Sequence, residues 1–114
     1  KIIKVSLNDY LDEINANKTV IWGAGHQALT VISLSNIKKK ISYIVDSATF
    51  KQNKYTPESH LLINKPDFML KDKPESIIVM AAGFSDEIVK IINAKYPFIQ
   101  NIAVLREDNL EIIK

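Results

Sequence analysis

The residues best suited to chemistry lie in a glycine turn that follows a short apolar strand pattern. Val20-Ile21-Trp22 runs into Gly23-Ala24-Gly25-His26-Gln27-Ala28, which is a G-x-G-x-x-A pattern. The first glycine permits a tight turn, the second lets backbone approach a phosphate, and Ala28 lets a helix pack closely on the strand. The helix N-terminus would then direct its N–H groups and its positive dipole end at the anion. The alternative is a strand-to-helix turn that only packs.

Polar residues near this turn extend the candidate site. Asp46 lies 21 residues after Gly25, about where a ribose-binding carboxylate is expected. It predicts either a contact with ribose hydroxyls or a cap on the following loop. His26 could donate a hydrogen bond to a phosphate, or carry a charge at mildly acidic pH, or simply lie at the surface. We expect Gln27, beside it, to belong to the same nucleotide site.

A polar segment over residues 47–60 shows neither helical nor strand periodicity. Loops of this length in a compact domain are usually functional or disordered, and two aromatic residues argue against simple disorder. Lys51 could pair with a diphosphate, Gln52 could read a base edge, and Tyr55 offers a stacking face with a polar tip. The alternative is that these three side chains only fold the loop onto its own domain.

Strand patterns alternate with helix patterns along the chain. Strands are predicted over residues 20–22, 41–45, 61–63, 77–81 and 102–105. Helices are predicted over residues 7–16 (capped by Ser6 or Asn8), 25–36, a short segment capped by Asn64, and a segment from Ser85 to before Pro97 whose apolar stripe is Phe84, Ile88, Ile91 and Ile92. Residues 106–114 extend a sheet edge or dock as a tail.

This alternation predicts an α/β fold: a three-layer, Rossmann-like domain with a mostly parallel sheet of four to five strands and helices on both faces. Ligands bind beyond the carboxyl ends of such strands. Three loops end there, at residues 23–27, 46–60 and 82–85. We expect them to surround one crevice, and Phe84 joins the candidate site for this reason.

Composition narrows the classes of function. The 114 residues suit a single domain, and a net charge of +2 gives no reason to expect nucleic acid or an anionic membrane as partner. The chain has no cysteine, no apolar run long enough to cross a bilayer and no signal-like segment, so a cytoplasmic protein is expected. The two histidines do not have metal-ligand spacing, and no metal site is predicted. Because the chain opens at Lys1, we expect a longer parent protein.

Several segments resemble, in the same order, the C-terminal domain of sugar C-methyltransferases. They are Gly23-Ala24-Gly25, Tyr43-Ile44-Val45-Asp46, Lys51-Gln52, Tyr55-Thr56-Pro57, and Phe84 with Asp86-Glu87-Ile88. The resemblance covers residues 7–105 and departs from the family pattern at Leu29, Asn53, Glu58 and Ala82-Gly83, which bears on substrate identity.

The resemblance implies an accessory domain that helps to hold a nucleotide-linked deoxysugar against a preceding catalytic domain. In the family that catalytic domain binds S-adenosylmethionine and follows a zinc-binding module. The resemblance therefore implies that this domain binds no cofactor itself and carries no catalytic residue. Two other hypotheses remain: an NAD(H)-binding domain of an oxidoreductase or sensor, favoured by the glycine pattern and Asp46, and a structural domain with a vestigial crevice.

Overall fold

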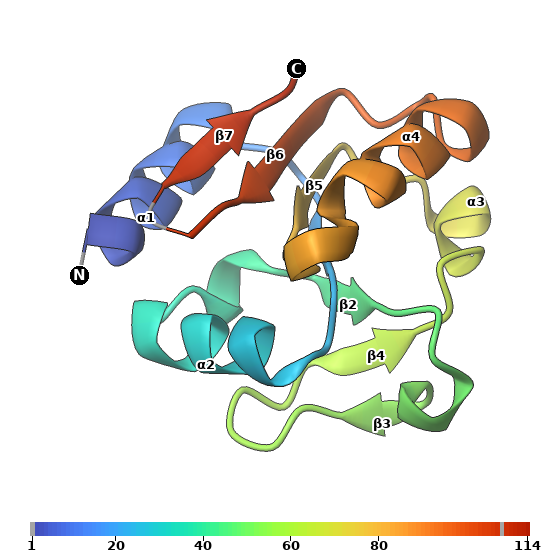
Figure 1. The fold of residues 1–114 in the computed structure, drawn as a ribbon, viewed down its shortest axis with the longest axis horizontal. Helices are drawn as coiled ribbons and strands as arrows, with labels where there is room; N and C mark the ends of the chain where they lie inside the picture. The colour runs from blue at the N-terminus through green and yellow to red at the C-terminus, as the bar shows by residue number, and fades with distance from the viewer. Residues whose placement is uncertain (1, 108) are drawn as a thin grey trace.

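A computed structural model describes the backbone of residues 2–107 and 109–114, with side chains from Leu7 onward. The strands are β1 Thr19–Trp22, β2 Tyr43–Val45, β3 Lys54–Tyr55, β4 Leu62–Asn64, β5 Ser76–Val79, β6 Asn101–Leu105 and β7 Leu110–Ile112. The helices are α1 Ile2–Ile14, α2 His26–Ser35, α3 Phe68–Asp72 and α4 Ser85–Lys95 (Figure 1). Short 3₁₀ turns lie at Lys38–Lys40, Thr49–Lys51 and Ala82–Phe84.

One seven-stranded sheet forms the middle layer, in the order β3-β4-β2-β1-β5-β6-β7. The five central strands run parallel, and β3 and β7 pair antiparallel at the two edges. The central strands are almost wholly apolar because helices cover both of their faces. The predicted mostly parallel α/β sheet is confirmed, and its two antiparallel edges bring the strand number above the expected four to five.

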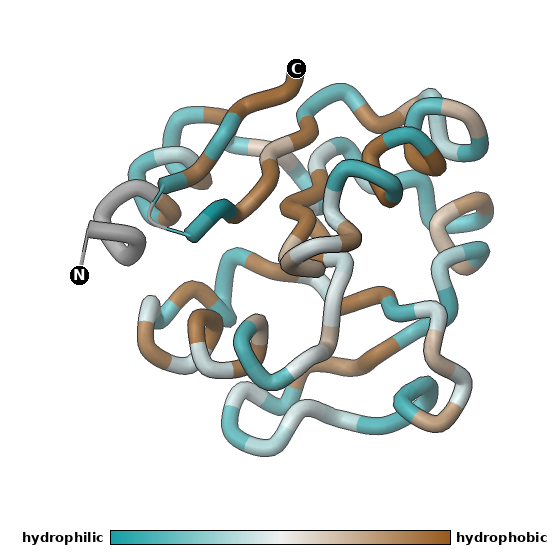
Figure 2. Tube along the Cα trace, in the orientation of Figure 1, coloured by the Kyte–Doolittle hydropathy of each residue, from teal (hydrophilic) through white to brown (hydrophobic). Residues whose placement is uncertain are grey.

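The helices form two layers, one on each face of the sheet. On one face, α1 and α2 pack through Leu7, Leu11, Ala28 and Ile32 against strand residues that include Ile21. On the other face, α3 and α4 pack through side chains such as Met69, Ile92 and Tyr96 against Val20, Val79 and their neighbours. Successive strand residues thus enter opposite cores, as the pleat requires. Figure 2 shows hydrophobic residues along the central strands and mostly hydrophilic ones along the β3 edge.

Three predicted helix caps are wrong. Helix α1 begins at Ile2, so Ser6 and Asn8 lie inside it; no Gly or Pro precedes Leu7 to stop the helix there. The Asn8 side chain instead donates a hydrogen bond to the Ser35 carbonyl at 3.0 Å. Asn64 ends β4, and α3 begins only at Phe68. Ser85 is the first residue of α4, and its hydroxyl accepts a hydrogen bond from the Ala81 N–H at 3.2 Å.

The segment over residues 47–60 is more ordered than its sequence pattern suggested. It contains the 3₁₀ turn Thr49–Lys51 and the edge strand β3, whose residues lie opposite Ile63 and Leu62 of β4. The buried Thr56 hydroxyl then accepts a hydrogen bond from the Leu61 N–H at 2.8 Å and closes the connection to β4. A two-residue strand leaves no periodic signal, because its partner strand supplies the hydrogen bonds that define it.

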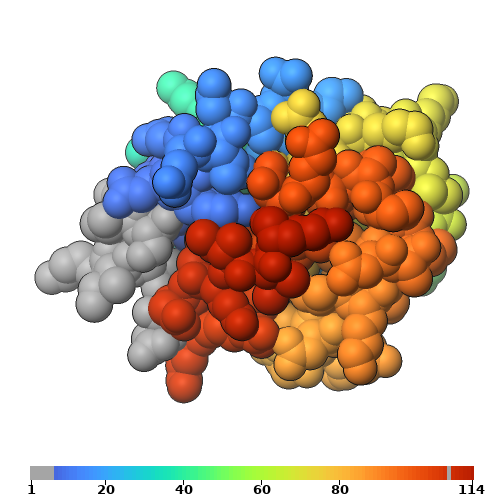
Figure 3. All heavy atoms as spheres, turned by 90° about the horizontal axis from the view of Figure 1, so that it is seen from above, coloured from blue at the N-terminus to red at the C-terminus, as the bar shows by residue number. Residues whose placement is uncertain are grey.

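The C-terminal residues extend the sheet, one of the two predicted alternatives. Strand β7 pairs with β6, with Leu110 opposite Leu105 and Ile112 opposite Ala103. Figure 3 shows this segment in red, filling the surface between α1 in blue and α4 in orange. Among the described residues, no helix is long and apolar enough to cross a membrane.

Candidate functional site

A cavity of about 670 Å³ lies at the carboxyl edge of the sheet, between the turns that follow β1 and β5. We call it the crevice. The chain leaves β1 toward β2 on one side, while β5 lies on the other, so the crevice sits at the topological switch point where ligands bind in such sheets. Its lining residues come from the end of β1, three loops and the first two turns of two helices: Trp22, Gly23, Gly25, His26, Gln27, Ala28, Asp46, Ser47, Lys51, Met80, Ala81, Ala82, Phe84, Glu87, Ile88 and Ile91.

Most of the predicted site residues line this crevice: Gly23, Gly25, His26, Gln27, Asp46, Lys51 and Phe84. The other two predicted residues do not. The Gln52 side chain donates a hydrogen bond to the Asp46 carbonyl at 2.9 Å and so braces the loop. Tyr55 lies on the edge strand β3, 65% exposed. The three loops therefore meet as expected, although the 46–60 segment contributes only its first part.

Gly23 is a glycine because the chain itself requires one. Its φ is +132°, a conformation that L side chains rarely adopt, and a Cβ would lie 2.2 Å from the Met80 carbonyl oxygen. Its N–H donates to the Val45 carbonyl at 2.9 Å. The first glycine of the motif thus lets β1 turn directly against the end of β5.

Gly25 is different, because beyond its two chain neighbours no atom of the described residues lies within 4 Å of the position that its Cβ would take. Its backbone is ordinary, with φ −76° and ψ 172°, and it precedes α2 without a capping side chain. The first hydrogen bond of the helix runs from Leu29 N–H to the Gly25 carbonyl at 3.0 Å. The N–H groups of His26, Gln27 and Ala28 therefore have no acceptor within the helix, and all three residues line the crevice.

Asp46 binds the backbone of two loops at the crevice, the glycine turn and the loop after β2. Its Oδ2 accepts a hydrogen bond from the Ala24 N–H and its Oδ1 one from the Ala48 N–H, each at 2.8 Å. The Lys51 ammonium lies 3.8 Å from Oδ2. Asp46 thus caps its own loop, as one alternative predicted, and also holds the glycine turn. Each carboxylate oxygen has a further lone pair, so the contact with a ribose hydroxyl stays a prediction.

The wall opposite α2 was recognised from the sequence only in part, because Phe84 was predicted for the site but Ile88 and Ile91 were not. Of the predicted apolar stripe of α4, Ile92 is buried against the sheet, but Ile88 is half-buried, Ile91 is 38% exposed and Phe84 is 74% exposed. These last three residues line the crevice. Their helical spacing was visible, but the spacing alone could not tell a core face from a site wall.

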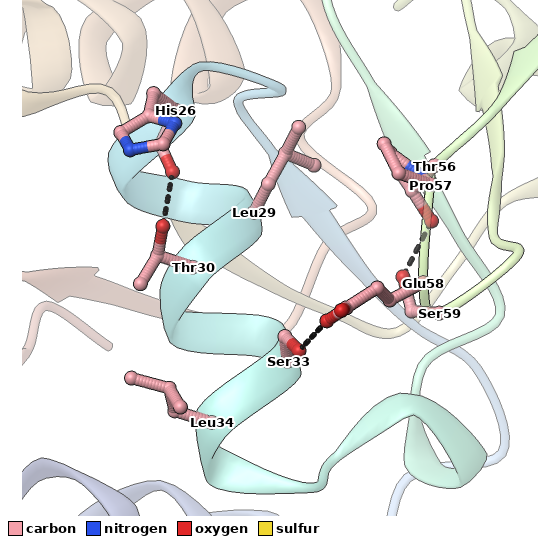
Figure 4. A pocket seen from close by; sticks show the side chains of 9 residues that line it. All are labelled: His26, Leu29, Thr30, Ser33, Leu34, Thr56, Pro57, Glu58 and Ser59. Carbon is pink, nitrogen blue, oxygen red and sulfur yellow. Dashed lines mark hydrogen bonds between the residues drawn. The ribbon is translucent and has the colours of Figure 1, made fainter.

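A second, smaller hollow of about 370 Å³ lies between α2 and residues 56–59 (Figure 4). His26 lines both hollows. Several polar side chains of the smaller one are already paired within the chain. Thr30 donates to the His26 carbonyl at 2.9 Å, Ser33 is bonded to Glu58, and Thr56 is bonded to Ser59. Within the described residues, no group of three or more His, Cys, Asp or Glu side chains could hold a metal ion.

Comparisons with known proteins bear on the family and on the fold. Residues 1–102 match the family model described as C-methyltransferase C-terminal domain. The structure resembles the crystal structure of UDP-D-quinovosamine 4-dehydrogenase from Vibrio fischeri, with a TM-score of 0.64 and 16% identity over 85% of this chain and 93% of that chain. At that identity the likeness shows the fold alone. The comparison with curated proteins gave no match. Because the family model spans most of its length, the chain belongs to the C-methyltransferase C-terminal domain family.

Proposed function

We propose that this domain binds the diphosphate of a nucleotide-linked deoxysugar at the N-terminus of α2. It thereby holds the sugar for a methyltransferase domain in the same polypeptide. That domain would precede this one, act in the cytoplasm and bind S-adenosylmethionine, the source of the methyl group. Family membership supports an accessory role, and the crevice residues supply binding groups for such a ligand.

Gly25 carries the proposal. The fold does not require a glycine there, since a Cβ would meet no atom of the described chain. A group that approaches the bare backbone would require it. The N–H groups at the start of α2 that have no acceptor within the helix, and the positive end of its dipole, favour an anion at that point. Lys51, whose ion pair with Asp46 is long at 3.8 Å, can add a charge-assisted hydrogen bond to a phosphate oxygen.

The exposed groups around this point suit a diphosphate better than a single small anion. His26 and Gln27 are exposed and line the crevice, so both can donate hydrogen bonds to phosphate oxygens. The crevice volume of about 670 Å³ also exceeds what one phosphate needs. Sites of roughly 300–1,000 Å³ are typical for small molecules and cofactors.

The test compares two glycine variants, Gly25→Ala and Gly83→Ala. Neither added methyl group would meet an atom of the described chain, so both variants should stay folded. NMR titration of the wild-type chain with UDP and with inorganic pyrophosphate should shift the amide signals of residues 23–27. Gly25→Ala should weaken both ligands by about tenfold or more, since the methyl group blocks the N–H groups. Gly83→Ala should bind like the wild type; equal binding by Gly25→Ala would contradict the proposal.

Two competing functions give different outcomes in the same assay. An NAD(H)-binding domain would show saturable micromolar binding of NADH, tighter than that of UDP, in a fluorescence titration. A purely structural domain with a vestigial crevice would show no shift with UDP, pyrophosphate or NADH. Asp46 does not favour a UDP-type ligand over NADH, because both ligands carry a ribose and a diphosphate.

A further inference from the structure

The crevice has two chemically unlike walls. The α2 side presents backbone N–H groups and exposed polar side chains. The α4 side presents Phe84, Ile88 and Ile91, which line the same cavity. Phe84 is 74% exposed, so its ring is open to a ligand in the cavity. A ligand that fits both walls needs an anionic part and a flat apolar part.

The turn that presents Phe84 is firmly built. The Phe84 N–H donates to the Ala81 carbonyl at 3.0 Å, and the Ala81 N–H donates to the hydroxyl of the fully buried Ser85 at 3.2 Å. Between them, Ala82 has a φ of +48°, a left-handed conformation that an alanine adopts only at a cost. Strained residues of this kind persist where the surrounding structure holds them, often at binding sites.

We infer that Phe84 is the stacking platform for the base of the bound nucleotide. The inference rests on the proposed function, because it needs the diphosphate at α2 to bring the base to the opposite wall. Ile88 and Ile91 line the same wall and border the ring with apolar surface. Stacking on an aromatic face tolerates every base, so the crevice should discriminate bases only weakly.

The test separates the base from the diphosphate by using two ligands, UDP and inorganic pyrophosphate. Phe84→Ala should weaken UDP binding about 5-fold to 100-fold, as expected for loss of one base-stacking partner. Phe84→Ala should leave pyrophosphate binding within about twofold of the wild type, because the anion site is intact. Phe84→Tyr should bind UDP like the wild type, because tyrosine keeps the aromatic ring. In the wild-type complex, the uracil H5 and H6 protons should show NOEs to the Phe84 ring.

Phe50→Ala is the matched control. Phe50 is also highly exposed, at 70%, and lies in the 3₁₀ turn Thr49–Lys51, but it does not line the crevice. The Phe50 ring lies 5.7 Å from the Lys51 ammonium, so any effect of its loss through Lys51 acts on the diphosphate and should change UDP and pyrophosphate binding alike. A loss of UDP affinity in Phe50→Ala equal to that in Phe84→Ala, with pyrophosphate binding unchanged in both, would overturn the inference, since general surface apolarity would then explain the effect.

Other outcomes also decide the matter. If wild-type protein binds UDP no more tightly than pyrophosphate, or if Phe84→Ala weakens both ligands equally, Phe84 is not a base platform, while the proposed diphosphate site stands. If neither ligand binds the wild type, the proposed function itself fails and the inference fails with it.

Discussion

Gly23 and Gly25 stand two residues apart and answer to different constraints. Gly23 is required by the protein's own backbone, whereas Gly25 faces open space in the crevice. The motif predicts a tight turn at the first glycine and an approach of backbone to a phosphate at the second. The packing of the β5 end against Gly23 confirms the first role, and the open space beside Gly25 leaves room for the second.

Gly23→Ala should destabilise the fold strongly. The new Cβ would lie 2.2 Å from the Met80 carbonyl oxygen, at a φ of +132°. Overpacking and backbone strain together predict a loss of roughly 2 to 6 kcal/mol in the free energy of unfolding. Urea denaturation followed by circular dichroism measures it, with Gly83→Ala as the control that should change stability little. A loss below about 0.5 kcal/mol would show that the β1–β5 contact relaxes easily.

Asp46 shows how one carboxylate can serve structure and site together. Its two oxygens bind the N–H groups of Ala24 and Ala48, so it joins the glycine turn to the loop after β2. Its spacing from the glycines made Asp46 a candidate site residue, but the sequence could not tell whether the carboxylate binds a ribose or the backbone. The backbone groups that it binds become neighbours only when β1 and β2 pair, with Trp22 opposite Val45.

At the scale of elements, two tyrosine–aspartate contacts fasten the short α3 segment to the rest of the domain. The Tyr43 hydroxyl donates to Asp72 Oδ2 at 2.8 Å, and the Tyr96 hydroxyl donates to Asp67 Oδ1 at 2.7 Å. Burial raises the pKa of both tyrosines, and the aspartates raise it further, so both hydroxyls stay protonated donors. A five-residue helix has little stability of its own, and these contacts compensate for its length.

Asp72 should make the fold sensitive to acid. Burial alone would raise its pKa, but hydrogen bonds from Lys18 and Tyr43, with the Lys18 charge, outweigh burial and hold the pKa below its usual value. The stability that Asp72 contributes is fully present above its pKa in the unfolded chain, about 3.9. It is lost as the pH falls through the lower pKa of Asp72 in the folded protein. Urea midpoints between pH 6 and pH 2 should therefore fall more steeply below about pH 4 for the wild type than for Asp72→Asn.

The control for this acid profile is Asp12→Asn, which removes an exposed carboxylate paired with Lys40. Exposed pairs of this kind contribute little to stability, so this variant should follow the wild-type profile. Identical profiles for wild type and Asp72→Asn would show that the Lys18–Asp72–Tyr43 contact does not couple to folding.

At the scale of the whole molecule, the chain offers a crevice for binding but should not carry out methyl transfer by itself. Calorimetric titration with S-adenosylmethionine should show no binding, since the proposal assigns that cofactor to another domain, while UDP in the same cell serves as the positive control. Labelled S-adenosylmethionine with a thymidine-diphosphate sugar should yield no methylated product. Saturable S-adenosylmethionine binding by this chain would contradict the proposal that this cofactor binds to another domain.

The parallel core of this protein is encoded locally. Strand β5 is apolar over residues 77–79, as expected for a strand covered on both faces. The switch from strand to helix pattern at the glycine turn marks the edge of the crevice. The fold class, the converging loops and the family resemblance follow from such short-range patterns. These patterns depend only on residues that are close together in the sequence.

The tertiary structure alone decided the rest, because those features depend on partners far along the chain. Strands β3 and β7 exist only through the hydrogen bonds of β4 and β6. Ile88, Ile91 and Ile92 carry the same apolar signal, yet Ile92 enters the core and Ile91 faces the crevice. Periodicity reports that a helix face is apolar; what covers that face is set by the packing of the whole sheet.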